Sequence, residues 1–111
     1  MIAQAKGRYI RISPMKMRQV IDLIRGKDVM TSLVVLTHLN KGSKTIISKV
    51  LNSALSNAKR KGLSEDQLFI SKITADQGPS WKRYRAAGFG RASSILKRTT
   101  HLTIELDLKI R

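Results

Sequence analysis

The sequence predicts an α+β fold in which three helices pack on a small antiparallel sheet and one long β-hairpin projects from it. Three observations indicate this fold. Residues 14–58 contain three segments whose apolar residues recur at helical spacing. Residues 101–111 alternate between apolar and polar side chains, as in a strand with one face on a core. Between these regions lies a basic segment that contains Gly88 and Gly90, where an extended chain can turn back.

The first predicted strand and the first predicted helix adjoin at Ser13. Residues 8–12 alternate and predict a short strand, with its two isoleucines on one face. Ser13 is expected to cap the helix, and Pro14 to occupy its first position, where the missing N–H costs nothing. Gly26 is expected to end it. The apolar stripe between these signals consists of Met17, Val20, Ile21 and Ile24.

Two further helices are predicted before residue 62. The second is expected to begin near Asp28 or Thr31, and the third is expected to begin at Ser43. The aliphatic residues of the second helix are expected to be buried: Val29, Leu33, Val34, Val35 and Leu36. Such a helix has few side chains that could read bases, so a helix-turn-helix is not expected. The third helix has the clearest stripe, formed by Ile46, Ile47, Val50, Leu51, Ala54, Leu55 and Ala58.

The hairpin is predicted from the strands at its base. Residues 68–75 are the expected antiparallel partner of residues 102–110, with a bend or bulge at Gly78 and Pro79. The ribbon from residue 68 to residue 86 would span on the order of 60 Å, whereas a compact domain of this length has a radius of gyration of about 13 Å. We therefore predict a single domain over residues 1–111, with residues 77–101 as an extended basic arm.

The charge of the chain indicates a polyanionic partner. Its 22 Lys and Arg residues and 7 Asp and Glu residues give a net charge of +15, and a compact body with this charge repels itself unless an anion neutralises it. The bases are spread over every predicted element. Nucleic acid is the first candidate, and an anionic membrane is the second. The membrane is not expected, because the longest aliphatic run, residues 33–36, is far too short to span a bilayer.

Other functional classes find little support. The chain has no cysteine and two histidines, so neither a metal site nor a cofactor is expected. The acids are scattered and form no set with a nucleophile and a base, so the chain is not expected to be an enzyme. Gly88 and Gly90 could suggest a phosphate-binding loop, but no apolar strand precedes them and no helix follows. No homo-oligomer is expected.

The candidate RNA-binding residues lie near the first helix and along the arm. Residues 6–27 contain seven bases and one acid, a net charge of +6. The arm combines cations with aromatic residues, which can stack on bases or pack on sugars; the plain alternative is a solvated loop. The candidates in the body are Lys6, Arg8, Arg11, Lys16, Arg18, Arg25, Lys27 and His101, the last with a structural role as its alternative. The candidates in the arm are Trp81, Lys82, Arg83, Tyr84, Arg85, Arg91, Lys97 and Arg98.

Several runs of the sequence resemble the bacterial-type large ribosomal subunit protein twenty-two family. With x for a position outside the resemblance, they are RYIRISPxKxR in residues 8–18, DLIRGK in residues 22–27, VLxSAxxNA in residues 50–58, DxGP in residues 76–79, GRA in residues 90–92 and KRTTHLT in residues 97–103. They recur in order and cover nearly the whole chain.

The resemblance implies a structural constituent of the large subunit, in the ribosome of the cytoplasm or of a plastid stroma. It implies a body on the outer surface of the large subunit near the exit of the peptide tunnel, binding early in assembly, and a hairpin that runs between segments of large-subunit ribosomal RNA. The hairpin tip would line the tunnel beside the nascent peptide and opposite large ribosomal subunit protein four. Its residues here are Ala86, Ala87, Gly88, Phe89 and Gly90.

The tip departs from the usual family pattern. Family members usually have a proline and two arginines where this chain has Ala86, Ala87 and Phe89, so phosphate contacts are not expected at these positions. The alternative function is that of a DNA-compacting architectural protein with a basic ribbon arm, which would be expected to act as a dimer.

Overall fold

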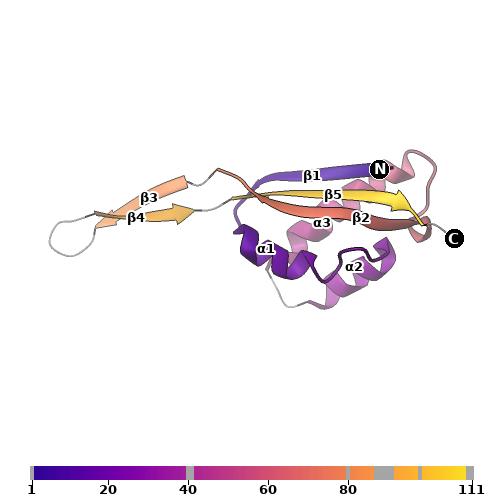
Figure 1. The fold of residues 1–111 in the computed structure, drawn as a ribbon, viewed down its shortest axis with the longest axis horizontal. Coiled ribbons are helices and arrows are strands. Elements are labelled where there is room, and N and C mark those ends of the chain that lie inside the picture. Colours follow the sequence, from indigo (N-terminus) through magenta and orange to yellow (C-terminus); the bar gives the residue numbers. More distant parts are fainter. Residues whose placement is uncertain (1, 40–41, 80, 87–91, 98, 110–111) are drawn as a thin grey trace.

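Two antiparallel sheets lie end to end along the molecule (Figure 1). The computed structural model describes residues 2–39, 42–79, 81–86, 92–97 and 99–109. The larger sheet has the strand order β1-β5-β2, with β1 at Ala3–Ile10, β5 at Thr100–Leu108 and β2 at Leu68–Gln77. The smaller sheet pairs β3 at Trp81–Ala86 with β4 at Ala92–Lys97. β5 is therefore the central strand of the body, although it comes last in the chain.

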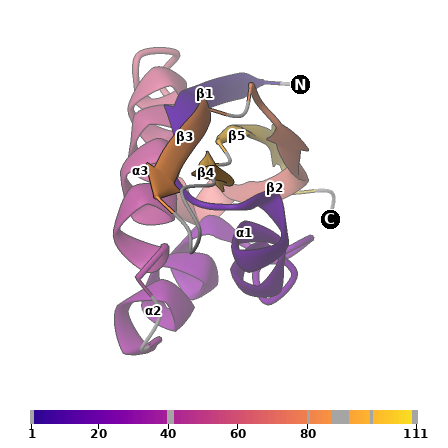
Figure 2. The same cartoon turned by 90° about the vertical axis from the view of Figure 1, so that its left-hand side faces the viewer.

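The helices lie on one side of the larger sheet (Figure 2). They are α1 at Pro14–Ile21, α2 at Val29–His38 and α3 at Lys44–Lys59, and a short 3-10 helix, η1, spans Glu65–Gln67. α3 packs on β1 and β5, α1 packs on β2, and α2 packs on α3. The prediction of three helices packed on a small antiparallel sheet is thus confirmed.

The core forms between the helical layer and the inner face of the sheet. The central strand contributes Leu102, Ile104 and Leu106, all fully buried. The predicted stripe of the first helical segment is buried at all four positions, and α3 buries its predicted stripe except for the half-buried Ile46. The outward-facing residues of β5 between them are polar, so the alternation in the sequence correctly predicts which face is covered.

The predicted strand over residues 8–12 is wrong, because β1 is Ala3–Ile10. Its inner residues, Ala3 and Ala5, are too small to give a clear alternating pattern. The space beside α3 requires small residues here: a Cβ added at Gly7 would lie 3.0 Å from Cγ2 of Val50 and 2.9 Å from Cδ1 of Ile10. Close packing of α3 on β1 therefore removed the signal that would have revealed the strand.

Three other details differ from the sequence predictions. Gly26 does adopt a left-handed φ of 75°, but α1 ends at Ile21, five residues before it. The prediction of a buried second helix is wrong for one side of α2, where Val34 is 58% exposed, because α2 packs on its neighbours from one side only. Leu108, expected to face the core, is 41% exposed at the last residue of β5.

The smaller sheet extends the molecule along its long axis. β2 leads into β3 past Gly78 and Pro79, and β4 returns to β5 past Thr99 (Figure 1). The molecule measures 65 × 25 × 17 Å, and its radius of gyration of 17.1 Å exceeds the value of about 13 Å for a compact domain of this length. The predicted turn at Gly88–Gly90 lies outside the described residues.

Candidate nucleic-acid interface

The start of α1 positions the first group of candidate residues. Oγ of Ser13 accepts a hydrogen bond from the backbone N–H of Lys16 at 3.4 Å, and Pro14 takes the first helical position, both as predicted. This cap fixes the first turn of a helix whose other side is buried in the core. Lys16 and Arg18 are consequently exposed on its outer side, and Arg11 is exposed just before it.

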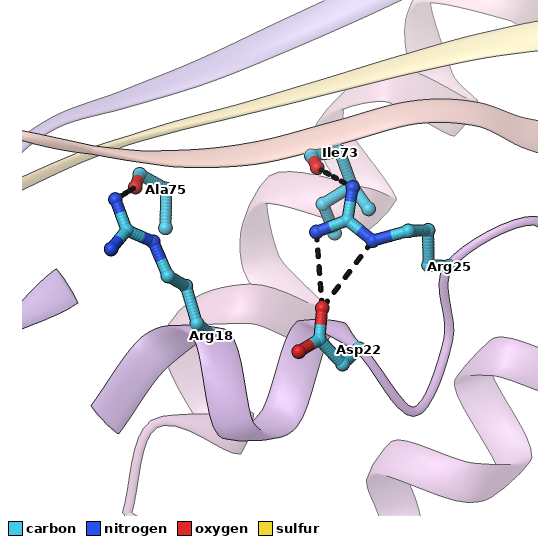
Figure 3. A network of polar contacts seen from close by, with 5 residues as sticks. All are labelled: Arg18, Asp22, Arg25, Ile73 and Ala75. Carbon is cyan, nitrogen blue, oxygen red and sulfur yellow. Dashed lines mark hydrogen bonds and ion pairs between the residues drawn. The ribbon is translucent and has the colours of Figure 1, made fainter. Parts of the chain in front are cut away.

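Arg18 and Arg25 point toward strand β2 (Figure 3). Nη2 of Arg18 donates a hydrogen bond to the backbone carbonyl of Ala75 at 2.9 Å, and Nη1 of Arg25 donates to that of Ile73 at 2.6 Å. Arg25 also contacts Asp22 through Nε and Nη2, at 3.3 and 3.1 Å. Because β2 is an edge strand, the carbonyls on its outer side pair with no strand among the described residues. The two guanidinium groups satisfy these carbonyls and cover the edge.

The segment between α1 and α2 continues this cover. The carbonyl of Lys27 accepts a hydrogen bond from the backbone N–H of Ile70 at 2.9 Å, and Asp28 forms an isolated bridge with Phe69. Among the described residues, Arg25 donates hydrogen bonds through all three of its nitrogens, whereas Arg18 donates one through Nη2. Sequence reasoning treated both arginines only as phosphate ligands and missed their role at the sheet edge.

The root of the arm is tightly packed. The backbone N–H of Gly78 donates to the carbonyl of Thr99 at 2.9 Å, the hydroxyl of Thr99 donates to the carbonyl of Pro79, and the hydroxyl of Thr100 donates to that of Ile12. Both threonines are fully buried. These bonds hold the two crossing segments together where the larger sheet ends and the arm begins.

Tyr9 has an unusual backbone next to this root. Its φ of 55° lies in the left-handed region, at the irregularity of β1 between Gly7 and Ile10. A non-glycine residue in such a conformation costs about 1–3 kcal/mol and persists only where its surroundings hold it. Here the backbone N–H of Tyr9 donates to Nδ1 of His101 at 3.1 Å, and the two rings meet edge to face with centroids 4.9 Å apart.

The structure places the candidate residues of the body in three groups. Lys6, Arg8 and His101 lie together around Tyr9 at the root of the arm. Arg11, Lys16 and Arg18 belong to the start of α1, and Arg25 and Lys27 lie along the edge of β2. Sequence reasoning named the members of the first group but not Tyr9 or Asp76, because no periodic pattern reports a left-handed residue or a cross-strand neighbour.

The candidate residues of the arm are placed by their backbone. In the ribbon Trp81 pairs with Lys97, Arg83 with Ile95 and Arg85 with Ser93. Ala86 is the last residue of β3, and the other predicted tip residues, together with Arg91 and Arg98, lie outside the described residues.

The end of the body farthest from the arm carries several acids, two of which have a lowered pKa. Asp28, Glu65, Asp66 and Asp107, four of the seven acids, lie where β2 begins and β5 ends. The hydroxyl of Thr31, and after it the ammonium of Lys109 at 3.3 Å, lower the pKa of Asp28 below its usual value. The hydroxyl of Ser71 likewise lowers the pKa of Asp107. Four of the seven acids thus gather at this end, beside basic residues such as Lys109.

Among the described residues, no group of three or more His, Asp or Glu side chains is arranged to hold a metal ion. Within the same ranges, no helix combines the length and apolar character needed to cross a membrane.

A basic body with a narrow two-stranded extension is typical of proteins that are embedded in a polyanionic partner. The family model described as "Ribosomal protein L22p/L17e" matches residues 5–107. The chain belongs to this family of ribosomal proteins.

Individual relatives match along nearly their full length, and all are described as large ribosomal subunit protein uL22. The relative from Halothermothrix orenii is 48% identical over 110 residues, which are 98% of this chain and 97% of the relative. The relative from Sulfurihydrogenibium sp. is 49% identical over 107 residues, 96% of this chain and 92% of the relative. The relative from Syntrophus aciditrophicus is 50% identical over 110 residues, 98% of this chain and all of the relative. The family predicted from the sequence is therefore confirmed.

Proposed function

We propose that this chain is a structural constituent of the large ribosomal subunit, which binds large-subunit ribosomal RNA and supports its assembly. The β3–β4 arm is proposed to line the nascent-peptide exit tunnel, near large ribosomal subunit protein four and beside the passing peptide. The chain acts as one domain over residues 1–111, with residues 77–101 as the arm, and it acts without a second copy of itself. Its role is to hold RNA segments together and to shape a channel.

One observation carries this proposal. A family of ribosomal proteins matches a chain that carries a net charge of +15 and reaches 65 Å along its long axis. A two-stranded ribbon is at best marginally stable alone in water, so a ribbon that leaves its own core needs a partner around it. RNA with its dense phosphate charge is the partner that suits the six bases of residues 81–98.

The cations on α1 and along the edge of β2 have different expected shares in RNA binding. Lys16 and Arg18 on α1 are expected to meet phosphates, since Lys16 is exposed and Arg18 keeps donors beyond its bond to Ala75. Arg25 is expected to contribute less, because its nitrogens are engaged with Ile73 and Asp22. In the arm, Arg83 and Arg85 and their neighbours are expected to meet RNA along both strands.

The first test is sedimentation of a tagged full-length chain from a bacterial lysate through sucrose gradients at moderate and at fourfold higher salt. A chain held only by loose phosphate contacts loses roughly 10³-fold or more in affinity over such a change. We expect the tag to remain with the large subunit at both salt concentrations. Release at high salt, or movement with DNA, would contradict the proposal.

A shortened arm tests whether reach or charge matters. The variant replaces residues 83–95 by Asn-Gly, a pair that suits a two-residue hairpin loop between Lys82 and Leu96. It loses three bases, and the control with Arg83→Gln, Arg85→Gln and Arg91→Gln loses the same three and keeps the arm. We expect both to join the large subunit, and only the control to cross-link to a stalled nascent peptide. Equal cross-linking by the shortened variant and the control would contradict the proposed role in the tunnel.

A further inference from the structure

A pocket of about 350 Å³ opens at the root of the arm. Its volume falls within the range of roughly 300–1,000 Å³ typical of ligand pockets. It is lined by Lys6, Arg8, Tyr9, Asp76, His101 and Thr103. These residues come from all three strands of the larger sheet, so the pocket is built by the body although it lies beside the arm.

The floor of the pocket is formed by pairs of residues on neighbouring strands. Asp76 on β2 is opposite His101 on β5, and Thr103 on β5 is opposite Lys6 on β1. Residues directly opposite each other share one face of a sheet. The next residue along β5, Leu102, is fully buried against the helices. The pocket therefore lies on the face opposite the helices, which no helix covers in the part of the chain that the structure describes (Figure 2).

Tyr9 forms an aromatic surface at this pocket. Its side chain is 56% exposed, although a tyrosine of this size usually gains from burial. The left-handed backbone and the bond to Nδ1 of His101 hold the residue in place, and the edge-to-face contact leaves much of the ring open to solvent. A backbone outlier that presents an exposed aromatic ring suggests a binding role rather than a packing role.

The charges around the ring define the ligand. Lys6 and Arg8 provide two cations, and Asp76 provides one anion that can only accept hydrogen bonds. Nδ1 of His101 is already occupied, because it accepts the hydrogen bond from the backbone N–H of Tyr9. The pocket thus offers cations for a phosphate, an acceptor for an N–H or O–H group, and an aromatic face for a planar ring.

We propose that this pocket binds one unpaired nucleotide of RNA. Its base stacks on Tyr9, its phosphate lies at Lys6 and Arg8, and an N–H of the base or the ribose 2′-hydroxyl donates to Asp76. The nucleotide is unpaired because a base within a duplex is stacked on its neighbours and cannot offer its face to a side chain. This inference rests on the proposed RNA-binding function and assigns one fixed nucleotide site to it.

The test measures binding of the full chain to in vitro transcribed bacterial large-subunit ribosomal RNA. We expect Tyr9→Leu to weaken binding roughly fivefold to hundredfold, the range typical of losing one stacked base. The matched variant Tyr9→Phe keeps the ring and should bind within about twofold of the unaltered chain. With 4-thiouridine in the transcript, irradiation should link the RNA to the peptide that contains Tyr9.

A second pair of variants keeps the test valid if Tyr9→Leu fails to fold. Lys6→Gln and Lys59→Gln remove the same charge, but Lys59 ends α3 at the opposite end of the body, where the neighbouring Lys61 contacts the carbonyl of Ile2. Lys6→Gln should lower the slope of log affinity against log salt by about 1, as for a lost phosphate contact. Lys59→Gln should leave this slope unchanged.

The outcomes separate the pocket from the proposed function. If the unaltered chain does not bind ribosomal RNA, the proposed function itself fails. If it binds, but a folded Tyr9→Leu binds equally well and the two lysine variants have equal slopes, the RNA binds elsewhere and the pocket proposal is overturned. Loss of affinity confined to Tyr9→Leu and Lys6→Gln, with the cross-link at Tyr9, supports it.

Discussion

β2 and β5 form one edge and the centre of a three-stranded sheet, whereas β3 and β4, which continue the same two chain segments, pair only with each other. The first sheet has helices on one face and fully buried side chains such as Ile104. The second contacts no helix closely enough to form a layer among the described residues. The body can therefore be stabilised by its own core, and we expect the order of the arm to depend on a partner.

The outer edge of β2 is covered by residues of the same chain. Along the outer edge of β2, the backbone carbonyl of Lys27 accepts a hydrogen bond from Ile70. The guanidinium groups of Arg25 and Arg18 donate to the carbonyls of Ile73 and Ala75. A sheet edge that is covered in this way is closed to other strands. The comparison shows that some basic residues of the body serve its own fold, so that positive charge alone does not identify an RNA contact.

The largest expected effect compares isoleucines in the two sheets. Ile104→Ala removes a fully buried side chain from the central strand and should lower the free energy of unfolding by about 2–5 kcal/mol. Ile95→Ala makes the same chemical change in β4, which has β3 as its single strand partner among the described residues, and should cost less than about 0.5 kcal/mol. Urea unfolding of the isolated protein, followed by circular dichroism, measures both. Similar costs would mean that the arm has a core of its own.

The junction between the two sheets gives the next effect. A Cβ at Gly78 would lie 2.5 Å from Oγ1 of Thr99 and 3.2 Å from two atoms of the His101 ring. Gly78→Ala must displace these groups and should cost about 1–3 kcal/mol. Gly42→Ala is the matched control, because a Cβ there meets nothing within 4 Å. Thermal unfolding compares them, and hydrogen exchange should quicken at Thr99 and Thr100 in the Gly78 variant alone. A neutral Gly78→Ala would show that the junction is loosely packed.

The parts of the fold that the sequence predicted best have large side chains at most of their periodic positions. The stripes of the first and third helical segments and the alternation of β5 combine several isoleucines and leucines. Each predicts the kind of element and its buried face correctly, although α1 ends earlier than expected. β1 was predicted in the wrong place because Ala3 and Ala5 have small side chains and Gly7 has none. The exposed side of α2 was missed because the aliphatic Val34 looks like a core residue, whichever way it faces.

The candidate site was predictable to the level of charge and not to the level of role. The sequence gives the cations around the root of the arm, but their grouping depends on the register of β1, β5 and β2. The left-handed Tyr9 and the pairing of Asp76 with His101 follow from this register and leave no periodic signal. Likewise, the contacts of Arg18 and Arg25 with β2 join residues that are 57 and 48 positions apart.

The smallest effect separates a cation that serves the fold from one that serves the partner. Arg25→Met removes the hydrogen bond to the carbonyl of Ile73 and should lower the free energy of unfolding by about 1 kcal/mol. Lys16→Met removes the same charge from an exposed position and should leave stability within about 0.5 kcal/mol. Urea unfolding of the isolated variants measures this difference.

The same two variants should rank in the opposite order when RNA is the partner. Lys16→Met is expected to weaken binding to large-subunit ribosomal RNA more than Arg25→Met, because the ammonium group of Lys16 is exposed whereas the guanidinium nitrogens of Arg25 are engaged within the chain. Binding titrations at two salt concentrations measure the ranking, and only Lys16→Met should reduce the salt slope. If Arg25→Met were as stable as the unaltered chain but bound RNA more weakly, the guanidinium would be a phosphate ligand. The edge of β2 would then not depend on its hydrogen bond to Ile73.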